Sequence, residues 1–315
     1  MNPLDYPICL HKARRTSPTS SWLGHIPFAM ALVDAVRPRR LVELGTMTGE
    51  SYCAFCQAVD TLGIGGSIEC FAVDTWRGDY QSGEYGQQVM DDLQHHHDLF
   101  YASFSTLIQS TFDDALHRFD EGSIDLLHID GLHTYEAVRH DFETWESKLS
   151  DRAVVLFHDT MVKDRDFGVW KFWKELSPKY PHFSFHHSAG LGVLAVGESQ
   201  PDIIRSLCGL SEDDQTKIRT FFQTLANRES SGPHQFTELL RNTISELFNI
   251  EPGTADMLLV VGYIMLSINE PEVARRLFRR IAIAEPNNLR FQHALKQSTG
   301  MLTSQSPSSN SGQAA

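Results

Sequence analysis

The sequence has little positive charge for its length. It contains 27 lysines and arginines against 40 aspartates and glutamates, so its formal net charge at pH 7 is −13. A protein that binds nucleic acid generally needs a basic surface to neutralise the phosphates. The composition therefore argues against nucleic acid as a general partner, and it does not identify an acidic or a basic substrate.

Long hydrophobic runs are also missing. The longest, from Met257 to Leu266, contains Gly262 and Tyr263 and is shorter than the roughly 20 apolar residues that a membrane-spanning helix needs. The first residues lack the charged start and the apolar core of a signal peptide. We therefore expect a cytoplasmic protein without a membrane span.

Cysteine is scarce, with five residues scattered along the chain. Cys53 and Cys56 have the C-x-x-C spacing of redox pairs, but they fall on a predicted helix that follows a glycine-containing loop. Two small core residues in a reducing compartment explain this pair better than a disulfide does.

The two common phosphate-binding loops are absent. The stretch from Leu41 to Gly49 predicts a short apolar strand containing Glu43, a loop between Gly45 and Gly49, and then a helix. It is neither G-x-G-x-x-G nor a P-loop with its lysine. Gly45 and Gly49 remove the Cβ atoms that would keep a ligand away from backbone N–H groups. The loop therefore favours a nucleotide-like cofactor without a long phosphate chain.

Apolar runs typical of strands alternate with helical patterns and indicate a mostly parallel α/β sheet. Thr75 to Phe100 is the least regular part of this region and predicts a long functional loop beside a binding crevice. The predicted strands are Leu41–Leu44, Ile68–Val73, Thr106–Gln109, Ile124–Ile129 and Ala153–Phe157, followed by the antiparallel pair Phe183–His186 and Leu191–Val196.

From Pro201 onwards, helical patterns occur without strands. Ala255 to Asn288 matches one tetratricopeptide-like unit, with Gly262 and Phe278 at positions of close helix packing; a helical cap with coincidental spacing is the alternative. A single repeat cannot bury its own apolar face, so it would dock on the catalytic domain, on a second copy or on a protein partner. The predicted organisation is a flexible N-terminal arm (1–21), a catalytic domain (22–198), a helical region (199–300) and a disordered tail (301–315).

Four motifs occur in order along the predicted catalytic domain. They are Val42-Glu43-Leu44-Gly45-Thr46 with Gly49, Phe71-Ala72-Val73-Asp74, Leu127 to Glu136, and Leu156-Phe157-His158-Asp159. The first two resemble those of class I S-adenosylmethionine-dependent methyltransferases. The last two resemble the metal-dependent small-molecule and sugar O-methyltransferases, the subgroup of macrocin O-methyltransferase and cephalosporin-tailoring proteins. The resemblance covers roughly residues 22–198 and implies a Rossmann-like, doubly wound sheet of seven strands.

The resemblance implies S-adenosyl-L-methionine as the cofactor, bound beyond the carboxyl ends of the strands. Asp74 would then bind the ribose hydroxyls through two charge-assisted hydrogen bonds, and Trp76 would lie against the adenine. The cofactor-binding residues that follow from motif position are Glu43, Gly45, Thr46, Gly49, Asp74, Trp76, Ser110 and Thr111.

Two further acids, Asp130 and Asp159, follow the fourth and fifth strands and should converge at one edge of the sheet. Two close carboxylates repel each other unless a proton or a cation lies between them, and oxygen ligands suit Mg²⁺. The resemblance implies a divalent metal held by Asp130, His158 and Asp159. His158 replaces the acid that is usual at its position, which would suit Mn²⁺. The alternative role for both acids is capping of the next helix.

His133 lies three residues beyond Asp130, at the start of the next helix. The helix dipole there disfavours the protonated imidazole, so we expect His133 to be neutral near pH 7. It would then act as general base toward an acceptor hydroxyl, with Asp130 holding the metal beside it. The alternative is a histidine bonded to a loop carbonyl. His128, inside the fourth strand, is predicted to be a buried core residue.

The leading hypothesis is a metal-assisted O-methyltransferase that acts on a hydroxyl of a sugar, a glycan or a natural product. An NAD-dependent oxidoreductase is an alternative that the missing third glycine disfavours. A non-catalytic assembly module in glycan biosynthesis is another, with the C-terminal helices recruiting a partner or forming a homo-oligomer. Binding of S-adenosylhomocysteine without binding of NAD would support the methyltransferase hypothesis.

Overall fold

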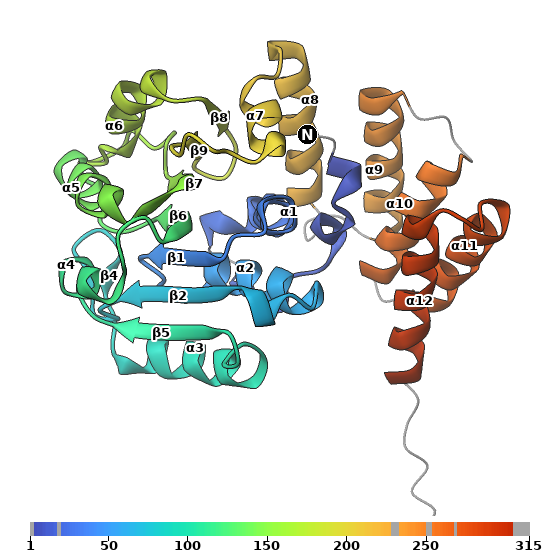
Figure 1. Ribbon diagram of the computed structural model, residues 1–315, viewed down its shortest axis with the longest axis horizontal. Helices are drawn as coiled ribbons and strands as arrows, with labels where there is room; N and C mark the ends of the chain where they lie inside the picture. Colours follow the sequence, from blue (N-terminus) through green and yellow to red (C-terminus); the bar gives the residue numbers. More distant parts are fainter. Residues whose placement is uncertain (1–2, 18–19, 228–232, 250–253, 268–269, 305–315) are drawn as a thin grey trace, which may run out of the picture. The chain divides into compact units, whose positions relative to one another are not determined.

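The computed structural model of the chain describes residues 3–17, 20–227, 233–249, 254–267 and 270–304 (Figure 1). The chain forms two compact units. The first comprises residues 1–9 and 13–227, and the second comprises residues 10–12 and 228–315. Among the described residues, no helix combines the length and the apolar character needed to cross a membrane.

A seven-stranded sheet forms the centre of the first unit (Figure 1). Its strands are β1 (Arg40–Leu44), β2 (Glu69–Asp74), β5 (Ser105–Gln109), β6 (Ile124–Ile129), β7 (Leu149–His158), β8 (His182–Phe185) and β9 (Leu191–Ala195). They lie in the order β5-β2-β1-β6-β7-β9-β8. The first five in this order are parallel, β9 is antiparallel to β7, and β8 is antiparallel to β9. The predicted α/β sheet with a closing antiparallel pair is confirmed.

The middle strands are mostly apolar and are buried along continuous stretches rather than at alternate residues, which is typical of parallel strands covered on both faces. Every residue of β6 is buried, and so is every residue of β7 from Ala153 to His158. Leu44, Ile129 and Phe157, at or next to the carboxyl ends of their strands, belong to one core cluster. The polar residues that follow these strands are therefore held by a rigid base.

Helices cover the sheet. In the first unit they are α1 (Ile26–Val36), α2 (Glu50–Thr61), α4 (Phe112–Ala115), α5 (Tyr135–Trp145), α6 (Val169–Leu176), α7 (Asp202–Cys208) and α8 (Glu212–Ala226), with α3 described below. Trp145 of α5 and Phe172 of α6 belong to the same core cluster as the strand ends. Thr134 caps α5 by accepting a hydrogen bond from the Ala137 N–H. This cap starts the helix directly after the loop that follows β6.

The segment predicted as one long loop is mostly regular. It contains an antiparallel hairpin, β3 (Gly78–Asp79) and β4 (Gly83–Glu84), followed by helix α3 (Gln87–Phe100). Only Leu93 and His97 of α3 are buried. A helix with so narrow a buried face leaves too weak an apolar pattern to be recognised in the sequence.

The first unit reaches Asn227, beyond the boundary predicted at residue 198. Helix α8 belongs to it because the ring of Phe222 packs between two aromatic rings of the unit. The ring centroid of Phe222 lies 5.4 Å from that of Phe28 in α1 and 5.8 Å from that of Phe185 in β8. Aromatic contacts of this kind are stabilising, so the strand-free stretch begins as part of the first unit.

The N-terminal arm, predicted to be flexible, is anchored where the structure describes it. Arg14 forms an ion pair with Asp60 of α2 at 2.5 Å. Arg15 donates from Nε to the Thr48 carbonyl at 2.5 Å. Residues 18–19 of the predicted arm lie outside the described residues.

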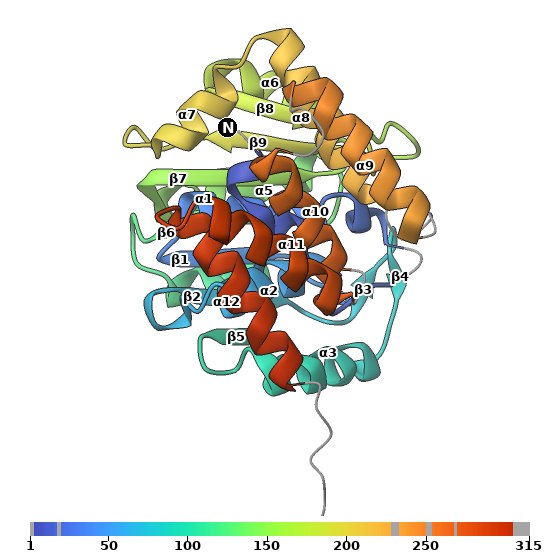
Figure 2. The ribbon, with the colours of Figure 1, turned by 90° about the vertical axis from the view of Figure 1, so that its right-hand side faces the viewer.

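The second unit consists of the helices α9 (Pro233–Phe248), α10 (Ala255–Ser267), α11 (Pro271–Ala284) and α12 (Leu289–Ser304) (Figure 2). Helix α11 packs against α10 and α12. A Cβ at Gly262 would lie 2.2 Å from Cε1 of Phe278, so the predicted close packing is present. The tetratricopeptide-like character of these helices stays a prediction, and residues 305–315 of the predicted disordered tail lie outside the described residues.

Asp125 of β6 should be a stability determinant of the first unit. It is fully buried, accepts hydrogen bonds from Nε of Arg39 at 2.9 Å and from Oγ of Ser150 at 2.7 Å, and accepts another from the Arg39 backbone N–H. Burial alone would raise its pKa, but these donors outweigh burial and lower it. We expect Asp125→Asn to cost about 2 kcal/mol of unfolding free energy, measured by urea denaturation.

The sign of the pH dependence follows from that lowered pKa. The contribution of Asp125 is present above the unfolded pKa of about 3.9 and is lost as pH falls through the lower folded value. Asp120→Asn, at an exposed position, is the matched control. A cost below about 0.5 kcal/mol for Asp125→Asn, in the range of ordinary surface substitutions, would contradict the prediction.

Candidate active site

A cavity of about 680 Å³ opens beyond the carboxyl ends of the parallel strands. Its lining comes from the N-terminal arm (Ser17, Ser20, Ser21, Trp22), the β1 loop and α2 (Gly45, Thr46, Met47, Thr48, Glu50, Ser51), the β2 end (Asp74, Thr75), the hairpin and its end (Gly78, Asp79, Ser82, Tyr85), the α4 start (Thr111, Phe112), the β6 loop (Asp130, Gly131, Leu132, His133) and the β7 end (His158, Asp159). This is the edge at which doubly wound sheets bind their ligands.

The loop after β1 requires a glycine at its first position. Gly45 has a φ of +87°, and a Cβ there would lie 2.2 Å from the Asp130 carbonyl oxygen. Gly49 also has a positive φ, of +81°, but its Cβ would meet the Leu93 side chain at 2.4 Å. Gly45 thus lets the two loops of the site approach each other. Gly49, which lies outside the cavity lining, makes room for α3 rather than for a ligand.

Asp74 lines the cavity and also shapes the loop after β1. Its Oδ2 accepts hydrogen bonds from the backbone N–H groups of Thr46 and Met47, both at 2.8 Å, and its Oδ1 accepts one from the Trp76 N–H at 2.7 Å. A carboxylate has about four lone-pair sites, so capacity for ligand hydroxyls remains. Asp74 therefore holds the loop in place whether or not it also contacts a ribose.

Besides Gly49, three more of the predicted cofactor residues lie away from the cavity lining. Glu43 is fully buried, and its Oε2 lies 2.8 Å from Nδ1 of His128, which is the buried core residue expected. Burial raises the pKa of Glu43 despite that neighbour. Trp76 is 1% exposed, and its indole N–H donates to the Met47 carbonyl. Ser110 donates its backbone N–H to the Asp74 carbonyl, whereas the neighbouring residue, Thr111, does line the cavity.

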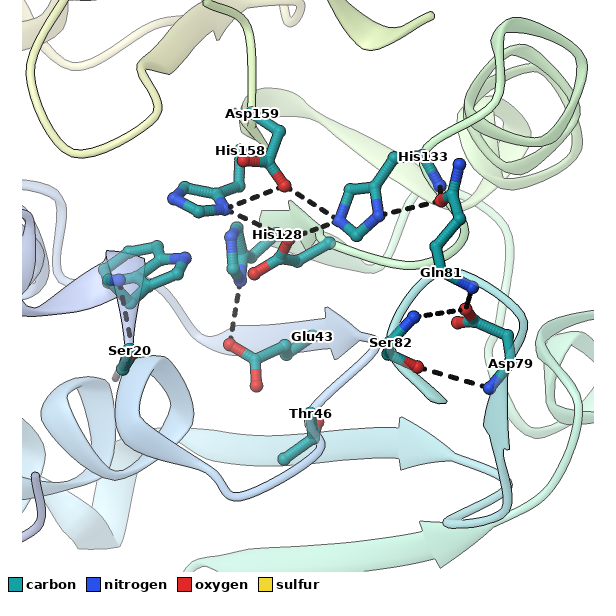
Figure 3. Close-up of polar contacts among 12 residues, drawn as sticks. Ser20, Glu43, Thr46, Asp79, Gln81, Ser82, His128, His133, His158 and Asp159 are labelled. Carbon is teal, nitrogen blue, oxygen red and sulfur yellow. Dashed lines mark hydrogen bonds and ion pairs between the residues drawn. The ribbon is translucent and has the colours of Figure 1, made fainter. Parts of the chain in front are cut away.

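Two carboxylates and two imidazoles meet at the other end of the cavity (Figure 3). Nδ1 of His158 lies 3.2 Å from Oδ1 of Asp130 and 3.5 Å from Oδ2 of Asp159. On the other side, Nε2 of His133 lies 2.8 Å from Oδ2 of Asp159 and 3.5 Å from Oδ1 of Asp130. The predicted convergence of the two acids is present, and an imidazole flanks them on each side.

The outer nitrogen of each imidazole faces a carbonyl oxygen. Nε2 of His158 lies 3.2 Å from the Ser188 carbonyl oxygen, and Nδ1 of His133 lies 3.1 Å from Oε1 of Gln81. A carbonyl oxygen only accepts, so each outer nitrogen carries a proton. In the neutral form, the inner nitrogen of each ring therefore presents its lone pair to the carboxylates. This is the arrangement usual for histidines that bind metals.

The charge state of His133 differs from the prediction. Burial lowers the pKa of each imidazole, but Asp130 and Asp159 outweigh it and raise the pKa of His158 to about 10 and that of His133 to about 9. His133 precedes the N-cap of α5, yet the adjacent carboxylates act more strongly on it than the helix dipole does. Without a cation, two protons on the imidazoles balance the two carboxylates.

The donor set fits a divalent cation. One ligand atom from each of Asp130, His133 and Asp159 lies within 4.8 Å of the others. The predicted set contained His158 and assigned His133 to proton transfer, so the geometry adds His133 as a further candidate ligand. Asp159 also has a φ of 61°, a conformation that costs about 1 kcal/mol or more in a residue other than glycine and that clusters at functional sites.

Sequence reasoning missed three contributors to the site. Gln81 lies at the hairpin tip, where the Gly-Asp and Ser-Gly pairs around it are turn signals that could have located the turn. Trp22 and Ser20 line the cavity from the segment read as the end of the arm and the start of the domain. No sequence pattern marks them as cavity residues, because their positions depend on tertiary packing.

Residues 42–160 match the family described as "Methyltransferase domain". The matched segment begins in β1 and includes the β1 loop, Asp74, and both carboxylates and both imidazoles of the cluster.

Among curated proteins, the chain is 50% identical over 181 residues to y4gI of Sinorhizobium fredii (strain NBRC 101917 / NGR234), which is described as uncharacterized. The matched stretch is 58% of this chain and 20% of the relative. The chain thus spans about one fifth of the length of the curated relative it matches.

Several solved structures are similar at low identity. The SAH-bound Podospora anserina methyltransferase PaMTH1 is 14% identical, with a TM-score of 0.43, covering 62% of this chain and 88% of that one. The O-methyltransferase TomG from Streptomyces achromogenes, in complex with SAM, is 15% identical, with a TM-score of 0.40, covering 62% and 91%. CalS11, a TDP-rhamnose 3'-O-methyltransferase of calicheamicin biosynthesis, is 16% identical, with a TM-score of 0.43, covering 55% and 78%.

At these identities and TM-scores, the similarities carry no information about the acceptor of this chain. The family match rests on sequence, and the strand order of the sheet agrees independently with the architecture that the motifs predicted. Residues 42–160 of this chain are thus similar to a methyltransferase domain, and they lie on a mostly parallel α/β sheet of seven strands.

Proposed function

We propose that the chain is an S-adenosylmethionine-dependent O-methyltransferase, assisted by a divalent cation, that acts on a hydroxyl of a sugar, a glycan or a natural product. The observation that carries this proposal is that one cavity joins the β1 loop and Asp74 to the cluster of Asp130, His133, His158 and Asp159. A donor bound by the loop and an acceptor bound by the cluster would share a single enclosed space.

The donor end would be formed by Gly45, Thr46 and Asp74, with Thr111 at the adenine side. Gly45 keeps the loop free of a Cβ, and Asp74 holds the backbone N–H groups of Thr46 and Met47 in place. S-adenosylmethionine would supply an electrophilic methyl group there. The contribution of the chain is to orient that group and to exclude water from it.

The acceptor end would be formed by the carboxylate and imidazole cluster. Asp130, Asp159 and His158 would hold Mg²⁺ or Mn²⁺, which when bound lowers the pKa of a neighbouring hydroxyl. With a cation balancing the two carboxylates in place of the imidazole protons, His133 would be neutral and would receive the hydroxyl proton at Nε2, because its Nδ1–H is already committed to Gln81. The carboxylates also keep the proton near the site once it has been transferred, since they favour the imidazolium.

The lining of the cavity favours an uncharged, hydroxyl-rich acceptor. It contains hydroxyl groups from Ser17, Ser20, Ser21, Thr75, Ser82 and Tyr85, and the residues that line it include no lysine or arginine. An acceptor anchored through phosphates would be expected to meet Arg or Lys side chains. A sugar or polyketide-like hydroxyl needs only hydrogen-bonding partners, which the lining supplies.

The experiment that tests the proposal is incubation of the protein with a glycan or metabolite extract and an isotopically labelled methyl donor. Mass spectrometry should then show the labelled methyl group on an acceptor oxygen, with S-adenosylhomocysteine formed in equal amount. Conversion of NAD in the same extract, with no labelled product, would favour the oxidoreductase instead.

Asp74→Ala should weaken binding of the methyl donor by about 2 kcal/mol, in the range for loss of a charged hydrogen-bonding partner. The loss has two sources, the ribose contacts and the loop that Asp74 holds through Thr46 and Met47. Calorimetric titration with S-adenosylhomocysteine measures it, with Asp164→Ala, an exposed acid outside the cavity lining, as the matched control. An unchanged affinity in Asp74→Ala would exclude this role for the end of β2.

A further inference from the structure

The hairpin of β3 and β4 holds the side chain of Gln81 against the active site in one orientation. Oδ1 of Asp79 accepts hydrogen bonds from the backbone N–H groups of Gln81 at 2.6 Å and Ser82 at 2.8 Å. At the base of the hairpin, a Cβ on Gly78 would lie 2.0 Å from the Gly83 carbonyl oxygen. The turn is therefore tightly built, and Gln81 at its tip is half-buried rather than free in solvent.

The orientation of the Gln81 amide is determined by two partners, His133 and Asp166, and Figure 3 shows the contact with His133. Its Nε2 donates to Oδ1 of Asp166 at 2.7 Å, and a carboxylate can only accept. Its Oε1 accepts from the backbone N–H of His133 at 2.9 Å, and an N–H can only donate. The flipped amide would lose both bonds, so the oxygen must face His133.

This orientation determines which ring nitrogen of His133 keeps its proton when the imidazole is neutral. Oε1 of Gln81 also lies 3.1 Å from Nδ1 of His133, so that nitrogen must carry a proton. Phe167 fixes the orientation of the His133 imidazole plane. The two rings stack with a centroid distance of 4.7 Å and an interplanar angle of 6°. Nε2 is thereby directed at Asp130 and Asp159.

We propose that Gln81 is a positioning residue, which together with Asp166 fixes the Nδ1–H tautomer and the direction of Nε2 in His133. Its effect on turnover rests on the proposed function, but its effect on the imidazole does not. A histidine with its proton on Nε2 could neither receive the acceptor proton there nor offer that nitrogen to a cation. Outer-shell partners of this kind typically change metal affinity or activity 10- to 100-fold when lost.

The first test compares Gln81→Ala with Gln88→Ala, a matched control at an exposed position of α3. In the metal-free protein with ¹⁵N-labelled histidine, the hydrogen-bonded Nδ1 proton of His133 should be visible in the wild type and in Gln88→Ala and should be lost in Gln81→Ala. The rate of methyl transfer should fall about 10- to 100-fold in Gln81→Ala only. Titration with Mn²⁺ alone, followed by electron paramagnetic resonance, should show the same affinity in all three proteins, because Asp130, Asp159 and His158 are proposed to hold the cation.

The second test is a charge-conserving rescue. Gln81→Glu alone places two carboxylates against each other at the position of the 2.7 Å contact with Asp166 and should impair the site. The double variant Gln81→Glu/Asp166→Asn restores a donor opposite an acceptor and should recover the Nδ1 proton, with a rate within about threefold of wild type. Such recovery is the signature of a direct pairwise interaction.

An unchanged Nδ1 proton signal in Gln81→Ala would overturn the assignment, as would failure of the double variant to recover that proton. The proposed function is tested separately by binding of S-adenosylhomocysteine to the wild type. If the wild type binds none, the function is wrong, whereas the spectroscopic comparison still decides the role of Gln81.

Discussion

Replacing Asp130 with asparagine is expected to lower the rate of methyl transfer by roughly 10³-fold or more and to remove the bound divalent cation. Asp130 provides one of the two carboxylates that face each other at the end of the cavity. A catalytic cation supplies several kcal/mol of charge stabilisation, and each 1.4 kcal/mol or so is a factor of ten in rate. The amide keeps the shape of the carboxylate but loses its charge, so folding should be preserved.

Chelation provides the same test without a substitution. Exhaustive treatment with EDTA should abolish turnover and leave S-adenosylhomocysteine binding largely intact, because the donor end of the cavity does not depend on the cluster. Re-addition of Mg²⁺ or Mn²⁺ should restore turnover in the wild type and not in Asp130→Asn. Asp164→Asn, at an exposed position outside the cavity lining, should behave like the wild type. Full activity after chelation, with no metal found by elemental analysis, would contradict the cation-assisted reaction.

Replacing His133 with alanine is expected to lower the rate by roughly 10²- to 10⁴-fold, the range for loss of a general base. His133 faces both carboxylates through Nε2 and has its other nitrogen committed to Gln81. The metal content should stay near that of the wild type, since Asp130, Asp159 and His158 are proposed to hold the cation. Rate measurements with elemental analysis of the same preparation separate the two roles of the imidazole.

The control for His133→Ala is His140→Ala, on the exposed face of α5, where His140 pairs only with Asp113 at 2.9 Å. It should leave both rate and metal content unchanged. Loss of metal together with activity in His133→Ala would make His133 a ligand, as the 4.8 Å grouping with Asp130 and Asp159 allows. The proton would then have to be received elsewhere, and His158 would be the next residue to test.

The elements that sequence reasoning located are those with strong local signals. β6 and the second half of β7 are mostly apolar, fully buried runs followed by polar residues, so both the strands and the meeting of Asp130 with Asp159 could be predicted. Parallel strands place their carboxyl ends at one edge, which converts sequence position into spatial proximity. The buried environment of His128 followed from the same reasoning, since it lies inside β6.

The parts that could not be predicted depend on contacts between distant segments. Gln81 is placed by Asp166, far along the chain, and by His133, so no local pattern marks it. The motif position of Trp76 predicts that it lies against the adenine. Its burial and its hydrogen bond to the Met47 carbonyl arise only when the β1 and β2 loops meet. The pKa of His133 also depends on the distance to both carboxylates, which outweigh the local helix dipole.

The most direct test of the central claim is a calorimetric titration of the wild type with S-adenosylhomocysteine and, separately, with NAD. The account predicts saturable binding of one S-adenosylhomocysteine per chain and no binding of NAD. The affinity for S-adenosylhomocysteine should be weaker in Asp74→Ala. Binding of NAD without binding of S-adenosylhomocysteine, or binding of neither, would contradict it.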